Sequence, residues 1–130
     1  MPSRAYQLLR ILGVGRAVIA GRFFPQGTSP VVNTTNKGKG YTITRTASAG
    51  IYTVTFDDKY VDLVHFGGTA QTTDGLSWTV SFGTYTVPTT TAPATMELFT
   101  RRGGVLLDLP ADPNNSVAFW FTFRNSSVVF

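Results

Sequence analysis

Apolar and polar residues alternate over much of the chain beyond residue 40, with the period of two that predicts β-strands. In the segment 117–124, Val117 and three phenylalanines occupy every second position, and Trp120 faces the other way. Turn residues such as Gly, Pro, Asn and Asp separate these segments. The other predicted strands cover 41–46, 51–56, 61–66, 76–82, 96–101 and 105–109, and a last short strand covers 128–129.

Short strands joined by turns, with no alternation of strands and helices, predict an all-β domain. We expect an antiparallel β-sandwich or a jelly-roll-like fold, in which two sheets pack around one core. Buried aromatic and aliphatic side chains each contribute about 1.5–3 kcal/mol to such a core. The side chains expected to supply most of it are Trp78, Phe82, Phe119, Phe121 and Phe123.

The first 30 residues differ from the rest. The segment 6–12 is compatible with a short helix or an extended arm, and the glycines that follow it argue against one long helix. Four arginines recur at intervals of six residues, which places them on one side of an extended chain. They are Arg4, Arg10, Arg16 and Arg22. We therefore describe a single domain with an N-terminal arm and first strand over 1–30, which is extended or partly helical, and a β-sandwich over 31–130.

Composition narrows the classes of partner. Charged residues make up only 14% of the chain, and the net charge of +4 is spread out, with Arg101–Arg102 as the adjacent basic pair. A nucleic-acid footprint is therefore disfavoured, because such sites gather basic residues into runs. The chain has no cysteine, which excludes disulfides, a thiolate nucleophile and zinc–sulfur sites. No uninterrupted apolar run is long enough for a signal peptide or a membrane span, so we expect no membrane association.

Residues that could carry catalysis are few. The one histidine, His65, lies in an apolar strand, where a packed or edge position is the simpler interpretation. The serines form no nucleophile-elbow motif, and the glycines form no phosphate-binding loop. Acidic residues gather at the turns 57–58 and 112–115, where Asp and Asn serve the backbone; a calcium site there lacks the expected ligand spacing. We predict a protein that is not an enzyme and has no cofactor or metal.

The last long strand is apolar on both faces, which indicates that both faces are covered. Another subunit could cover the Trp120 side, since tryptophan is enriched at interfaces; a loop or the N-terminal segment could cover it equally well. Aromatic residues beside arginines could also stack on single-stranded nucleic acid, but a core or a subunit interface is the simpler interpretation. The predicted subunit interface comprises Trp120, Phe99 and Arg124.

Three parts of the chain resemble small structural proteins of tailed bacteriophages. These parts are 12–23, 40–58 and 112–128, and they consist of turn-and-strand patterns. The strand 50–56, Gly-Ile-Tyr-Thr-Val-Thr-Phe, is also similar to strands in trimeric jelly rolls of the complement-globular and tumour-necrosis type. This resemblance implies a virion protein that forms a homotrimer.

Two roles follow from the phage resemblance. A capsid decoration (cement) protein sits on the capsid exterior and ties neighbouring copies of the major capsid protein together. The alternative is a tail-fibre or receptor-binding tip that attaches to the host surface. Only about 40 residues precede the clear β domain, and no coiled-coil or collagen-like repeat is present, which favours decoration. The arm would then bind the shell through Arg4, Tyr6, Leu8, Arg10, Ile11, Leu12, Arg16 and Arg22.

Overall fold

The computed structural model describes residues 16–58 and 62–124, which form two antiparallel sheets packed against each other. The predicted all-β sandwich is thereby confirmed. A 3₁₀ turn, η1 (Asn33–Thr35), lies between the first two strands. The strands are β1 (Arg16–Phe23), β2 (Tyr41–Arg45), β3 (Ile51–Phe56), β4 (Asp62–Gln71), β5 (Trp78–Thr86), β6 (Thr95–Arg102), β7 (Val105–Leu106) and β8 (Ser116–Arg124).

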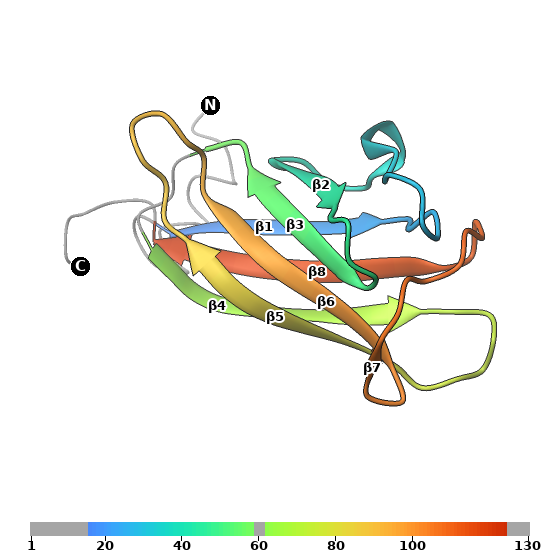
Figure 1. Cartoon of the computed structure of the whole chain (residues 1–130). Coiled ribbons are helices and arrows are strands. Elements are labelled where there is room, and N and C mark those ends of the chain that lie inside the picture. Colours follow the sequence, from blue (N-terminus) through green and yellow to red (C-terminus); the bar gives the residue numbers. More distant parts are fainter. Residues whose placement is uncertain (1–15, 59–61, 125–130) are drawn as a thin grey trace, which may run out of the picture.

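The two sheets differ in size. The three-stranded sheet has the order β1–β8–β4, and the five-stranded sheet has the order β2–β3–β6–β5, with β7 paired to β6. Figure 1 shows the two sheets face to face, with β8 (red) between β1 and β4. β1 pairs with β8 along its whole length, from Arg16 opposite Arg124 to Phe23 opposite Val117. The first strand is therefore part of the sandwich.

The core lies between the sheets and is rich in aromatic rings. Phe121 and Phe123 of β8 meet Phe56 of β3 edge to face, with ring centroids 5.2 and 4.8 Å apart. All three are fully buried, as the alternation of β8 predicts. Edge-to-face pairs add about 0.5–1.5 kcal/mol beyond the area that they bury. Trp78 and Phe82, in contrast, are only partly buried and pack against the rim of this core.

β4 differs from its prediction in length and in burial. It continues through Gly67 and Gly68 to Gln71, although the glycines suggested an end at residue 66. Val64 and Phe66 are 44% and 45% exposed, because β4 is an edge strand whose register shifts between Leu63 and His65. The predicted strand 105–109 shortens to β7, and the predicted strand 128–129 lies outside the described residues.

The segment after β7 is tied to the five-stranded sheet by a carboxylate. Arg45 donates two hydrogen bonds to Asp108, at 3.1 Å from Nε to Oδ1 and 2.6 Å from Nη2 to Oδ2. The backbone N–H of Gly50 donates to the same carboxylate at 2.9 Å, and the hydroxyl of Tyr52 lies at 3.4 Å. Partial burial alone would raise the pKa of Asp108, but the hydrogen bonds from Arg45 and Gly50 outweigh it and hold that pKa below its ordinary value. Burial and the nearby carboxylate raise the pKa of Tyr52.

Candidate binding face

The outer face of the three-stranded sheet carries the side chains that alternate with the core residues. Trp120 lies at its centre, because β8 is the middle strand, and its side chain is 40% exposed. Ala20 on β1 and Gly67 on β4 lie opposite Trp120 in the register. We call this surface the tryptophan face; it comprises Val18, Ala20, Arg22, His65, Gly67, Thr69, Gln71, Ala118, Trp120, Thr122 and Arg124.

The indole ring lies across the sheet because its neighbours are small. A Cβ atom on Gly67 would overlap the Cζ2 and Cε2 atoms of Trp120, so the ring occupies the space above that glycine. One side of the ring rests on the β4 backbone, and the exposed fraction comes from the rest of the side chain. On the β1 side, Ala20 adds only a methyl group. The result is a low platform with a wide aromatic surface.

Positive charge borders this platform. Arg22 of β1 reaches across β8 and donates from Nη1 to Oε1 of Gln71 on β4 at 3.3 Å. At the other end of β8, Nε of Arg124 is buried without a hydrogen-bond partner among the described residues. Arg124 pairs in the register with Arg16 on one side and with Asp62 on the other. Arginines therefore mark both ends of the platform, and one carboxylate lies at its margin.

The structure brings together residues of two predicted sites: Trp120 and Arg124 were predicted at a subunit interface, and Arg16 and Arg22 in the segment that binds the capsid. Trp120, Arg124 and Arg22 share the tryptophan face, and Arg16 occupies a register position at its end. Arg16 and Arg22 both belong to β1, an edge strand of this sheet. The remaining residues predicted to bind the capsid, Arg4, Tyr6, Leu8, Arg10, Ile11 and Leu12, lie outside the described residues.

Phe99 does not join this surface. It lies on β6, in the other sheet, and its side chain faces outward and is half-buried. The guanidinium carbon of Arg101 sits 5.3 Å from its ring centroid, a cation–π contact that covers the ring from within the chain. Trp120 and Phe99 therefore lie on opposite faces of the sandwich, and one flat interface cannot contain both.

Sequence reasoning missed the small residues that make the platform. Val18 is 53% exposed at the β1 edge of the face, and Ala20 and Gly67 flank the tryptophan. The outward positions of β1 alternate with buried Ile19, so a period of two was present there as well. The role of Gly67 could not be seen in this way, because it depends on a side chain that is far away along the chain.

A second set of exposed apolar side chains lies where β4 meets β5. Phe66 contacts Phe82 edge to face, with ring centroids 5.3 Å apart, and Val64 lies beside it in the irregular part of β4. This edge closes the sandwich on the side opposite β1. It adds exposed apolar surface next to the tryptophan face, because β4 contributes to both.

The described titratable side chains do not gather into a group with the composition of a metal site. His65 is exposed on the outer side of β4, opposite Thr122 in the register. In the ranges 16–58 and 62–124, no three His, Cys, Asp or Glu residues come together as a group that could hold a metal ion. No helix within these ranges is long and apolar enough to span a membrane.

Comparison of the chain with protein-family models, with curated proteins and with solved structures gives no match. The interpretation of the tryptophan face therefore depends on its own geometry and chemistry.

Proposed function

We propose that the chain is a non-enzymatic structural protein of a phage virion that decorates the outside of the capsid and binds the major capsid protein through the tryptophan face. The observation that carries the proposal is the exposed Trp120 at the centre of that face, framed by small residues and bordered by arginines. The phage assignment itself comes from the resemblance of the turn-and-strand patterns.

An exposed tryptophan on a level surface is suited to binding another protein. Tryptophan is over-represented among the residues that dominate interface energies, particularly where a pocket or a rim excludes water around it. Burying the exposed part of the Trp120 side chain contributes about 2 kcal/mol. Ala20 and Gly67 allow the partner surface to approach closely, because neither projects beyond the ring.

The arginines specify the charge of the partner. Arg22 and Arg124 lie on the face itself, and Arg16 occupies its end in the register. We expect the complementary surface on the capsid protein to be acidic, because opposite charges orient the encounter and raise its rate. Exposed ion pairs add only about 0–1 kcal/mol each, so the apolar contact must supply most of the affinity.

The N-terminal segment extends this interface in the proposal. It precedes Arg16, which pairs with Arg124 at the end of the tryptophan face. Apolar and basic residues of 4–12 would then bind the shell beside the platform. Repeated copies on one shell, and association into a homotrimer, would multiply weak contacts into stable attachment. Each bound copy would oppose the separation of the capsid subunits that it bridges.

The test is reattachment to capsid shells that lack this protein. Trp120→Asp places a charge in the apolar contact. We therefore expect its affinity for the shells to be at least about tenfold lower, which is measured as a lower occupancy of the shells at the same protein concentration. Val105→Asp is the matched control, since Val105 is 58% exposed on the other sheet. Full attachment of Trp120→Asp would refute the proposed face. Imaging that locates the protein at the tail tip would refute the decoration role and favour receptor binding.

A further inference from the structure

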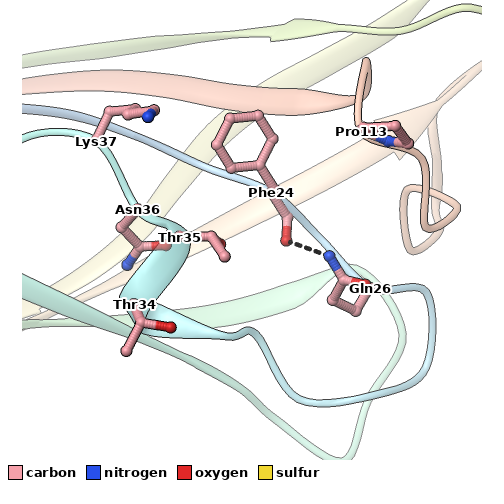
Figure 2. A pocket seen from close by; sticks show the side chains of 7 residues that line it. All are labelled: Phe24, Gln26, Thr34, Thr35, Asn36, Lys37 and Pro113. Carbon is pink, nitrogen blue, oxygen red and sulfur yellow. Dashed lines mark hydrogen bonds between the residues drawn. The ribbon is translucent and has the colours of Figure 1, made fainter.

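A hollow of about 470 Å³ lies beyond the end of β1, at residues separate from those of the tryptophan face. Figure 2 shows the lining side chains around a common space, with the ring of Phe24 between Lys37 and Pro113. Cavities of this size hold small organic ligands. The lining consists of Phe24, Gln26, Thr34, Thr35, Asn36, Lys37 and Pro113.

The walls of the hollow are held by backbone hydrogen bonds to the sandwich. The N–H of Arg22 donates to the carbonyl of Lys37 at 3.0 Å, and the N–H of Lys37 donates to the carbonyl of Arg22 at 2.8 Å. These two hydrogen bonds fix the backbone of Lys37 to the end of β1. The N–H of Gly27 donates to the carbonyl of Leu109 at 3.1 Å, which ties the Gln26 wall to the segment before β8. A ligand would therefore meet a hollow that is already formed, and the entropic cost of ordering loops on binding would be small.

The wall at η1 is fixed through a side chain. The amide of Asn33 pairs with the backbone of Ile43: Nδ2 donates to the carbonyl at 3.0 Å, and the Ile43 N–H donates to Oδ1 at 2.7 Å. Asn36 then donates from Nδ2 to the same Oδ1 of Asn33 at 2.7 Å. Because that oxygen can only accept, the orientation of the Asn36 amide is fixed.

The hydrogen bonds around the hollow leave the oxygen of one lining amide, that of Gln26, facing a ligand. The oxygen Oδ1 of Asn36 has no hydrogen-bond partner in the described part of the chain, but it is buried and therefore lies out of reach of a ligand in the hollow. Gln26 uses Nε2 to donate to the carbonyl of Phe24 at 3.2 Å, which leaves its Oε1 for a ligand. Lys37 supplies the positive charge of the lining, and no carboxylate is among the lining residues.

We propose that this hollow binds one unit of a saccharide. A sugar presents C–H groups that can pack on the Phe24 ring, and its hydroxyls can donate to Oε1 of Gln26 and accept from Lys37. A metal ion would need oxygen ligands that include carboxylates, and a phosphate would need more donors than one ammonium group. An apolar ligand would leave the amides and hydroxyls of the lining unpaired. This inference does not depend on the capsid role.

The experiment is a titration of the full, isotopically labelled chain, followed by amide chemical shifts. The probes are glucose, galactose, mannose and N-acetylglucosamine, each up to high millimolar concentration. We expect at least one of them to shift amide signals of residues 24–37 and 114 with a millimolar Kd. Gln26→Ala and, as a smaller change on an exposed residue, Thr34→Val should each weaken that binding several-fold. Trp120→Ala is the control and should leave it unchanged.

Three results would overturn the inference. The first is the absence of shifts in this region with all four sugars, measured on the folded wild-type chain. The second is a response that moves with Trp120→Ala, since binding would then lie on the tryptophan face. The third is equal binding of a neutral tripeptide at the same signals, which would assign the hollow to peptides. Capsid attachment of Trp120→Asp can be measured on the same preparations, so either proposal can fail while the other stands.

Discussion

On the outer face of the five-stranded sheet the chain covers its own large side chains, whereas on the outer face of the three-stranded sheet Trp120 stays open. Phe99 lies under the guanidinium of Arg101, which donates to Oγ of Ser81 at 2.7 Å. Glu97 accepts from the N–H of Thr84 at 2.9 Å. We call this surface the threonine face; it comprises Thr42, Thr44, Thr53, Thr55, Glu97, Phe99 and Arg101.

The two outer faces differ in the kind of side chain that they expose to solvent. On the threonine face, Thr42 pairs with Thr55 and Thr44 with Thr53 in the register of β2 and β3, so short polar side chains lie next to each other across the two strands. On the tryptophan face, one side of the Trp120 ring packs on the backbone of Gly67, and the other side is exposed to solvent. The threonine face therefore offers short polar side chains, whereas the tryptophan face offers a large exposed aromatic ring.

The largest effect should come from Asp108, which ties the chain to the five-stranded sheet. Asp108→Ala removes the acceptor of Arg45 and of the Gly50 N–H, and we expect the free energy of unfolding to fall by about 3 kcal/mol. Urea unfolding of both proteins measures this. Asp58→Ala, in an exposed turn, is the control and should change little. Equal stability of the two variants would mean that the ion pair does not hold the sheet together.

The same carboxylate predicts how stability depends on pH. The pKa of Asp108 is lower in the folded chain than in the unfolded chain, so its contribution is complete above about pH 4 and is lost as pH falls through the folded value. The hydrogen bond from the indole of Trp78 and that from the Leu76 N–H likewise lower the pKa of Asp74, so wild-type stability alone cannot isolate Asp108. The stability difference between wild type and Asp108→Asn should stay constant from pH 6 down to about pH 4 and then shrink as pH falls further. A difference that stays constant below about pH 4 as well would contradict the prediction.

The sequence predicts those features of the two faces that depend on residues close together along the chain. It does not predict features that depend on contacts between distant segments. Alternation along β8 correctly separated buried Phe121 from outward Trp120, since that pattern is local. Gly67 was interpreted as a strand end because glycine usually weakens strands, whereas here it makes room for a ring on the neighbouring strand. Phe99 was grouped with Trp120 because both had basic neighbours, and only the sheet order places them on opposite faces.

Gly67→Ala should disturb the platform without unfolding the sandwich. The added methyl group would overlap the Trp120 ring, so the ring must swing away from β4, at a cost of about 1–2 kcal/mol. In a Trp78→Phe background, Trp120 is the remaining tryptophan, and its fluorescence should shift to longer wavelength. Attachment to shells should weaken together with this shift.

Thr69→Ala gives the comparison for that variant, because Thr69 lies on the same strand and faces the same side. It removes a hydroxyl and a methyl group without adding any atom near the indole ring. Unchanged emission and unchanged attachment in Gly67→Ala would show that the ring does not depend on the glycine beneath it.

The smallest effect should come from the threonine face. Thr53→Ala removes one member of the pair with Thr44, and cross-strand pairs of this kind contribute about 0.5 kcal/mol. Combining it with Thr44→Ala in a double-mutant cycle isolates the pair from the change in strand propensity. Attachment to shells should stay at the wild-type level in all three variants, because the proposed contact lies on the other sheet. If these variants lost attachment while Trp120→Asp kept it, the roles of the two faces would be reversed.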